Sequence, residues 1–250
     1  MDKQGSARGF SDGVRLVREG LQLIRRRDIL PWVIAPITLN TVVYIAMIWF
    51  ALSRVEPLIA ELVSMLPQWL AFLEWFAWTA AVLLVLVIIA YTFTFVANLI
   101  GSPLNSLLAE KVLIAEGGTP VSGSGAMSLL ASIPVSLARE GAKLLYLLPR
   151  LIVVLIVSFI PPFNLISPVI WFVFGAWSLS LEYTDYGAEA TGHKFASVRV
   201  RSKKNRSAWM GLGAMGMVVT MVPILNLVAM PAMVCAGTML WARAPRSHDS

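Results

Sequence analysis

The chain has 250 residues, of which 58% are hydrophobic and 14% are charged, and its formal net charge is +6. A soluble domain carries roughly 25% charged residues, so a soluble fold of this size is excluded because it could not bury so much apolar surface. Nucleic-acid binding is not needed to explain the basic charge, since contact with anionic membrane lipids accounts for it. The composition predicts an all-α integral membrane protein in which residues 1–250 form a single domain.

Residues 8–24 are predicted to form an amphipathic helix on the inner membrane surface. Their apolar side chains recur at helical spacing, namely at Phe10, Val14, Val17, Leu21 and Ile24. Residues 1–28 lack the apolar core of a signal peptide, so we expect the first span itself to direct insertion.

The densest positive charge of the chain, Arg25–Arg27, directly precedes the first apolar run. Guanidinium groups bind oxyanions through two parallel hydrogen bonds, so Arg25, Arg26 and Arg27 are candidates for an anion-recruiting site. A topology anchor on anionic lipid is the alternative interpretation of the same residues.

Two long charge-free runs are predicted to cross the bilayer, at residues 29–53 and 75–102. Each run exceeds the roughly 20 residues that one crossing needs. The string Gly101–Pro103 is expected to end the second span. Residues 104–116 are then expected to form a further helix that stops at Gly117.

Two further apolar runs, residues 151–181 and 207–242, each contain the string Pro-x-x-Asn-Leu, with its asparagine at Asn164 or Asn226. Broken apolar helices at corresponding positions of an internal repeat indicate a transport site. The leg before the first break, Leu151–Ile160, spans only about 15 Å as a helix. It is too short to cross a hydrocarbon core of roughly 30 Å.

The distribution of basic residues favours re-entrant hairpins for these two runs. Most of the 20 basic residues lie in three segments, 1–28, 110–150 and 182–206, and basic loops remain cytoplasmic. Residues 182–206 stay inside only if the run before them enters the membrane and returns. We therefore expect two partly penetrating helical hairpins with tips near Asn164 and Asn226. Four full spans are the alternative, because the lengths of both runs allow it.

Polar groups in or beside the apolar runs are the remaining candidates for a transport path. Glu110 and Lys111 follow the expected helix break and form either a pore-lining pair or a plain surface pair. Four asparagines either line a water-filled path or bond neighbouring helices. They are Asn98, Asn105, Asn164 and Asn226.

Other chemistries lack their residues in this sequence. The chain has no phosphate-binding loop, no protease constellation and no metal-ligand spacing, so we expect no enzymatic activity, no ATPase function, no metal site and no cofactor. Cys235 is predicted to be a small buried apolar residue. Four tryptophans are predicted to lie at the membrane interface, namely Trp171, Trp177, Trp209 and Trp241.

Three stretches of the chain form a pattern through their order and spacing. They are Ala97–Lys111 continued by Gly117–Pro120, then Glu182–Tyr186, then Val222–Pro231 with Cys235 behind it. In this pattern the chain resembles the CysZ family of bacterial inner-membrane sulfate permeases, and the resemblance covers nearly the whole sequence.

The resemblance implies sulfate transport across the bacterial inner membrane into the cytoplasm, which supplies sulfur for cysteine biosynthesis. It implies a multi-pass homo-oligomer with two full spans and partly penetrating helices, and sulfate as the bound partner near an arginine pair before the first span. The family places that pair at the positions of Leu30 and Pro31, whereas the arginines of this chain lie at 25–27, about one helical turn earlier. The few fixed charges along the apolar runs favour a passive, channel-like path. Transport of sulfite or thiosulfate, or a non-conducting membrane scaffold, are the alternatives.

Overall fold

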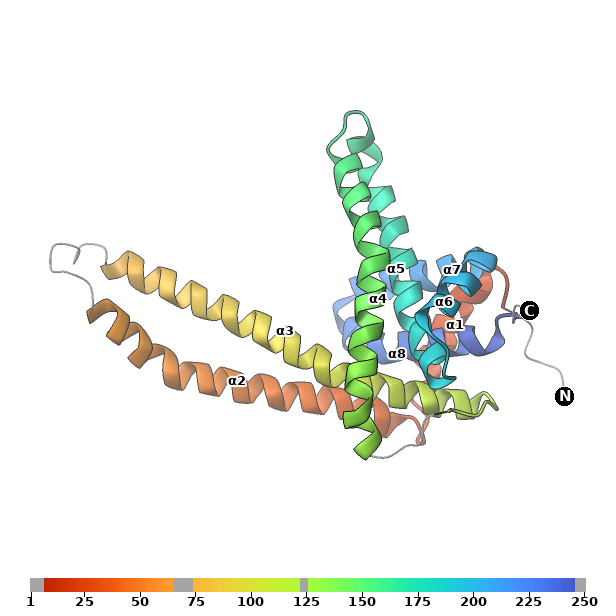
Figure 1. The fold of residues 1–250 in the computed structure, drawn as a ribbon, viewed down its shortest axis with the longest axis horizontal. Coiled ribbons are helices and arrows are strands. Elements are labelled where there is room, and N and C mark those ends of the chain that lie inside the picture. Colours follow the sequence, from red (N-terminus) through yellow and green to blue (C-terminus); the bar gives the residue numbers. More distant parts are fainter. Residues whose placement is uncertain (1–6, 65–73, 122–125, 246–250) are drawn as a thin grey trace. The chain divides into compact units, whose positions relative to one another are not determined.

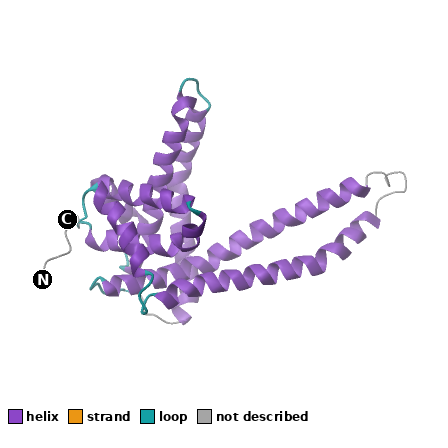
Figure 2. Ribbon diagram, turned by 180° about the vertical axis from the view of Figure 1, so that it is seen from behind, coloured by secondary structure: helices purple, strands orange, loops and turns teal. Residues whose placement is uncertain are grey.

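The structure, a computed structural model, describes residues 7–64, 74–121 and 126–245. Every regular element in this part of the chain is a helix (Figure 2), which confirms the predicted all-α class. The chain divides into two compact units, one formed by Ile34–Ser102 and the other by Met1–Val33 together with Pro103–Ser250. A single integral membrane domain over residues 1–250 stays a prediction.

The unit Ile34–Ser102 consists of most of helix α2 (Leu30–Ser64) and of helix α3 (Glu74–Ala115), which run antiparallel to each other (Figure 1). Large apolar side chains on these helices face outward. Trp49, for example, is 72% exposed. The stretch Leu30–Phe50 is long and apolar enough to cross a membrane. A helix that exposes such side chains along its length requires lipid as its solvent.

Helix α3 continues through Gly101–Pro103, where the sequence predicted a stop. The helix has 42 residues, so it is about 63 Å long. Apolar residues flank the proline on both sides, and an ended helix among them would leave backbone groups without partners. The predicted stop at Gly117 is confirmed, because α3 ends at Ala115 and Gly117 adopts a left-handed φ of 79°.

The second unit has its core where α1 (Phe10–Leu23) packs against α7 (Arg206–Met221) and α8 (Pro223–Arg243). Glycines allow the close approach, since a Cβ on Gly13 would lie 2.1 Å from the carbonyl oxygen of Ala208. The predicted helix at 8–24 is confirmed. Val17 and Ile24 of its apolar stripe are buried, whereas Phe10 is 50% exposed, so most of the stripe packs within the protein and its contact with the membrane surface stays a prediction.

The predicted tryptophan belt is wrong at two of its four positions. Trp209 and Trp241 are 0% and 3% exposed, and the Trp209 indole N–H donates to the Thr184 hydroxyl over 3.2 Å. Trp171 is 36% exposed. Cys235 is buried, as predicted. Large aromatic rings therefore fill the core of the second unit as well as facing outward.

The first predicted hairpin is formed by α4 (Ala126–Ser158) and α5 (Ser167–Ala190), which lie side by side (Figure 1). The short 3₁₀ helix η2 (Phe163–Ile166) connects them, so the chain reverses at the predicted tip. The apolar stretches Leu137–Ser158 and Phe163–Ala190 are both long enough to cross a membrane. The estimate of a short leg failed because α4 continues past Arg150 toward its N-terminus. Leg length therefore no longer separates a re-entrant hairpin from two full spans.

The second break lies at Val222, between α7 and α8, and not at Asn226. Pro223 explains this position, because proline forces the preceding residue into an extended conformation and is favoured in the first turn of a helix. Val222 has φ −91° and ψ 111°. Asn226 belongs to α8, and its side chain lies outside the described ones.

Helix α6 (Phe195–Lys204) and the turn before it complete the second unit. This helix follows α5 and carries basic residues in its last turn. The turn between α5 and α6 passes through Gly192, whose φ of 74° is left-handed. Helix α6 thereby contacts both α4 and α5.

Candidate functional site

The predicted arginine site lies in the short segment between α1 and α2, and all its side chains are exposed. Arg26 forms a two-point ion pair with Asp28, with N–O distances of 3.2 and 3.0 Å. Within the described part of the chain, Arg25 and Arg27 have no carboxylate within ion-pair distance. The segment therefore offers exposed guanidinium groups, and sulfate binding by them stays a prediction.

Asn105, Glu110 and Lys111 lie near the C-terminal end of α3, within the second unit. Asn105 is 2% exposed. Its amide nitrogen lies 3.7 Å from the sulfur of Met230 and also reaches the Tyr186 hydroxyl. Of the two interpretations given to Asn105, these contacts favour bonding between helices.

Glu110 is buried, which excludes the plain surface pair with Lys111. The residue is 6% exposed, and burial is the main cause that raises the pKa of its carboxyl above the ordinary value. Lys111 lowers that pKa in part. The Lys111 ammonium lies 5.1 Å from the centre of the Trp32 ring, a cation–π contact.

The four candidate asparagines are not gathered at one site. Asn164 is exposed in η2, next to the N-terminus of α5, whereas Asn105 lies against Tyr186 near the other end of α5. The side chains of Asn98 and Asn226 lie outside the described ones. A path lined by all four residues stays a prediction.

A group of charges that was not predicted from the sequence joins α4 to α5. We call it the α4–α5 charge cluster, and its members are Arg139, Glu140, Lys143, Glu182 and Asp185. Lys143 lies 2.6 Å from Glu140, 2.9 Å from Glu182 and 3.7 Å from Asp185. Arg139 pairs with the Asp185 carboxylate and donates to the His193 carbonyl over 2.7 Å.

The centre of the cluster is buried, with the side chains of Lys143 and Asp185 only 4% and 5% exposed, whereas Glu140 and Glu182 at its edge are 41% and 32% exposed. Buried charges are costly unless each is paired and hydrogen-bonded, and here each has a partner of opposite sign. The signal was available in the sequence. Arg139 and Lys143 are four residues apart, and Glu182 and Asp185 are three apart, so each pair shares one helix face.

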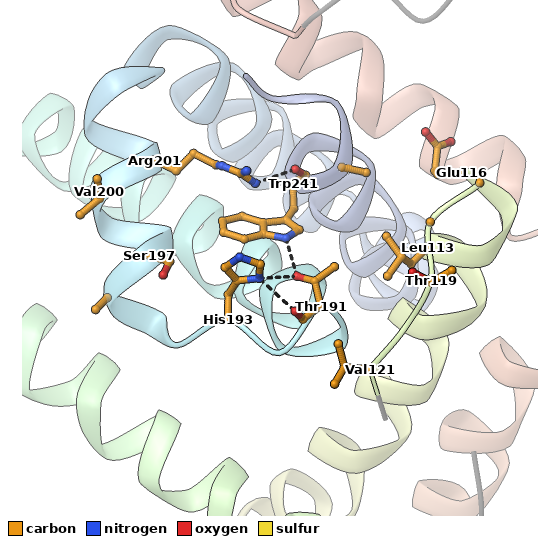
Figure 3. Close-up of a pocket in the computed structure, with 14 residues that line it drawn as sticks. Leu113, Glu116, Thr119, Val121, Thr191, His193, Ser197, Val200, Arg201 and Trp241 are labelled. Atoms are coloured by element: carbon orange, nitrogen blue, oxygen red, sulfur yellow. Dashed lines mark hydrogen bonds between the residues drawn. The ribbon is translucent and has the colours of Figure 1, made fainter. Parts of the chain in front are cut away.

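A cavity of about 830 Å³ lies between the end of α3, the α5–α6 turn, α6 and the end of α8. Its lining includes the backbone of Gly117 and Gly118, together with polar side chains (Figure 3). These are Glu116, Thr119, Thr191, His193, Ser197, Arg201 and Trp241. Most of these groups can donate a hydrogen bond, which suits a small polar or anionic guest.

Trp241 organises one wall of this cavity. Figure 3 shows its indole between Arg201 and His193. The indole N–H donates to Thr191 Oγ1 over 2.8 Å, and Arg201 donates to the Trp241 carbonyl over 2.9 Å. The Arg201 guanidinium carbon lies 3.9 Å from the ring centre. Trp241 therefore contacts the cationic Arg201 and the neutral Thr191 at the cavity wall.

Glu116, the acidic residue of the lining, is held by Arg243. The guanidinium donates to both Glu116 carboxylate oxygens over 2.7 and 2.8 Å, and to Glu19 over 2.6 Å. These bonds raise the pKa of Arg243 further above its ordinary range. The ion pairs neutralise the carboxylate at the cavity and connect α1, the end of α3 and α8.

Within the described residues, no group of three or more His, Cys, Asp and Glu side chains is arranged to hold a metal ion. The exposed His193 ring lies 3.0 Å from the Thr191 hydroxyl through Nδ1 and contacts Trp241 edge-on. Hydrogen bonding at the cavity wall, and not metal coordination, is what this arrangement offers.

Comparison with known proteins shows the family of the chain. Residues 16–231 match the family described as sulfate transporter CysZ/etoposide-induced protein 2.4. A protein of Pseudomonas aeruginosa PAO1 named sulfate transporter CysZ is 39% identical over 92% of this chain and 94% of its own length.

Two further relatives carry the same name. The protein of Pectobacterium atrosepticum is 36% identical over 92% of this chain and 84% of its own length. The protein of Salmonella typhimurium is 35% identical over 95% of this chain and 94% of its own length. The chain therefore belongs to the sulfate transporter CysZ/etoposide-induced protein 2.4 family.

Proposed function

We propose that this protein transports sulfate across the bacterial inner membrane into the cytoplasm and so supplies sulfur for cysteine biosynthesis. The observation that carries the proposal is the likeness to relatives named sulfate transporter, which extends over at least 92% of this chain. The sequence offers no phosphate-binding loop, so the path is channel-like and works without an ATPase of its own. The protein acts as a permease and has no enzymatic activity.

The chemistry of sulfate sets what the path must supply. Sulfate is a strongly hydrated dianion, and its transfer into hydrocarbon is costly unless protein donors replace the water. Exposed guanidinium groups at Arg25 and Arg27 would recruit the ion by charge. The donors of the 830 Å³ cavity, among them Thr119, Ser197 and Arg201, would hold it weakly enough for release.

The hairpins extend this proposal into the membrane. The α4–α5 and α7–α8 pairs enter from the cytoplasmic side and return, with their breaks at Pro161–Ile166 and Val222. A new helix begins after each break, at Ser167 and at Pro223. The N-terminus of a helix favours anions. Basic α6 between the two hairpins supports this topology, since basic segments remain cytoplasmic.

Assembly of several copies completes the path. Helices α4 and α5 expose large apolar side chains, among them Leu145 at 79% and Val169 at 63%. Surfaces of this kind contact lipid or another copy of the chain. A homo-oligomer would enclose a path that one copy does not surround.

Uptake of labelled sulfate by purified protein in lipid vesicles tests the function. We expect uptake that competes with unlabelled sulfate, and a decrease in Arg25→Gln combined with Arg27→Gln. Exposed Lys203→Gln combined with Lys204→Gln removes the same charge from α6 and should leave uptake unchanged.

Two outcomes would contradict the proposal. Folded protein that gives no sulfate uptake indicates a membrane scaffold. Stronger competition by sulfite or thiosulfate than by sulfate indicates a transporter of another oxyanion. A tag inserted after Lys204 tests the topology separately, and it should be found on the same side as both termini.

A further inference from the structure

Two arginines from different helices approach the ring of Tyr146. The guanidinium carbon of Arg150, on α4, lies 3.6 Å from the ring centre, and that of Arg199, on α6, lies 4.5 Å from it. The ring itself is fixed, because Tyr146 is 7% exposed and makes an edge contact with Phe195 at 5.9 Å between ring centres. The two guanidinium carbons are therefore no farther apart than the sum of these two distances.

Neither of these charges is neutralised within the described part of the chain. Neither Arg150 nor Arg199 has a carboxylate within ion-pair distance there. Among the described residues, Arg150 donates to the carbonyl of Tyr146, and the buried Arg199 Nε has no hydrogen-bond partner. Arg139 and Arg243, in contrast, each bind carboxylates.

An anion bound between the two arginines stabilises this arrangement. Two positive charges this close repel each other, and a buried N–H without an acceptor costs free energy. A tetrahedral oxyanion offsets both costs, since its oxygens accept from guanidinium groups in two-point geometry.

The surroundings of Arg150 indicate which oxyanion binds. One turn after Arg150 on the same face of α4, Val153 is apolar and 59% exposed. The stretch Leu137–Ser158 around it is apolar enough to cross a membrane, so acyl chains lie beside it and an oxyanion at this position is attached to a lipid. We propose that Arg150 and Arg199 together bind the phosphate group of an anionic phospholipid.

The proposal explains how two helices are held at one level of the membrane. Arg150 lies within the apolar stretch Leu137–Ser158 of the hairpin, and Arg199 lies on the basic helix α6. A phosphate bound by both would fix α6 to the membrane surface beside α4. The site is separate from the cavity lined by Arg201 and His193, because neither Arg150 nor Arg199 belongs to that lining.

Lipid-dependent thermal stability of the purified full chain in detergent tests the site. We expect phosphatidylglycerol, but not phosphatidylcholine, to raise the unfolding midpoint of the wild type. Arg150→Gln combined with Arg199→Gln should lose most of this rise. Native mass spectrometry should show at least about tenfold weaker retention of the anionic lipid, because charge-assisted hydrogen bonds are lost.

A matched variant separates this site from general charge attraction. Lys203→Gln with Lys204→Gln removes two exposed charges from the same helix, and it should keep the full rise. An equal loss in both variants would overturn the proposal. So would a rise produced by free sulfate, and not by the lipid, that disappears in the arginine variant.

Variants that keep the positive charge test the site even if the double glutamine variant misfolds. Arg150→Lys and Arg199→Lys retain the positive charge but lose the two-point geometry. Each should bind phosphatidylglycerol more weakly than the wild type. Undiminished binding in both, together with a misfolded double variant, would assign the arginines a structural role only and would refute the lipid site. Sulfate uptake is a separate measurement, so failure here is distinguishable from failure of the proposed transport.

Discussion

The two ends of the α4–α5 hairpin are held together by different interactions. At the base, Lys143 and Asp185 are buried members of the α4–α5 charge cluster, and the Lys143 ammonium lies 2.6 Å from Glu140. At the tip, neutral groups are used: the Ser167 hydroxyl and the Trp171 indole donate to Ser158 Oγ over 2.8 and 3.0 Å. Neutral, paired groups can enter hydrocarbon at small cost, whereas formal charges cannot. The difference agrees with the proposed topology, in which the tip of the hairpin lies in lipid and its base lies near water.

The largest effect is expected from Asp185→Ala at the base. The change leaves Arg139 without its carboxylate and Lys143 with one fewer, in a buried site. Breaking a buried ion pair in this way costs about 3–5 kcal/mol. Unfolding of the purified protein, followed by denaturant titration in detergent micelles, measures this cost.

Asp28→Ala is the matched control for that experiment. It breaks the pair with Arg26, whose side chains are 55% and 56% exposed, and exposed pairs contribute about 0–1 kcal/mol. If Asp185→Ala cost no more than Asp28→Ala, the cluster would not hold the hairpin base, and the contrast between base and tip would disappear.

A smaller loss is expected from Gly213→Ala, where α7 meets α5. A Cβ at this position would lie 1.7 Å from the Ala176 carbonyl oxygen, so the helices must move apart. Such overpacking costs about 1–3 kcal/mol. Gly141→Ala is its control on α4, because a Cβ there meets nothing within 4 Å.

The control should have the opposite sign. Alanine at a helix position where its Cβ meets no other atom stabilises by up to about 1 kcal/mol relative to glycine. The unfolding midpoints of both variants, in the same detergent, give the comparison. Destabilisation by both substitutions would show that the close contact of α7 with α5 is not the cause.

Ser158→Ala tests the tip, where we expect a loss of about 0.5–1.5 kcal/mol because two donors lose their shared acceptor. Ser64→Ala removes a hydroxyl whose hydrogen bond, among the described residues, is to the Glu61 carbonyl of its own helix over 2.7 Å, and should be nearly neutral. Proteolysis of the protein in lipid vesicles detects opening of the tip. Equal protease resistance in both variants would remove the role given to Ser158.

The helices of this fold were predictable where local signals decide, and less so where tertiary contacts do. The left-handed Gly117 ended α3 as expected, since only its own backbone was involved. Gly101–Pro103 did not end that helix, because the surrounding apolar chain favours continued backbone pairing. Trp209 was assigned to the interface by its residue type, but its contact with Thr184 and the close packing of α1 and α7 buried it.

The candidate site shows the same division. Arg25–Arg27 lie exposed in the short segment between α1 and α2, which both an anion-recruiting site and a lipid anchor require. Asn105 and Glu110 were recognised as unusual residues, yet their burial depends on α5 and α8, which a pattern of residues along α3 does not reveal. The α4–α5 charge cluster required two helix faces to be read together. The spacing of the charged residues within each helix indicates which face of α4 and which face of α5 carries them. Only the fold shows that these two faces meet.

The smallest effect is expected for the pH dependence of stability that Glu110 causes. Glu110 lies outside the predicted spans, and its buried carboxyl can be compared with the paired carboxylates at the hairpin base. Burial raises the pKa of its carboxyl above the ordinary value of 4.5, so the folded protein favours the neutral form. The stabilisation that comes from neutral Glu110 is fully present below the ordinary pKa of the carboxyl. It is lost as the pH rises through the raised pKa of the folded protein. The unfolding midpoint should therefore fall with rising pH across that interval, and Glu110→Gln should reduce the slope. An unchanged slope in the variant would mean that Glu110 is charged in the folded protein, as the paired carboxylates at the hairpin base are expected to be.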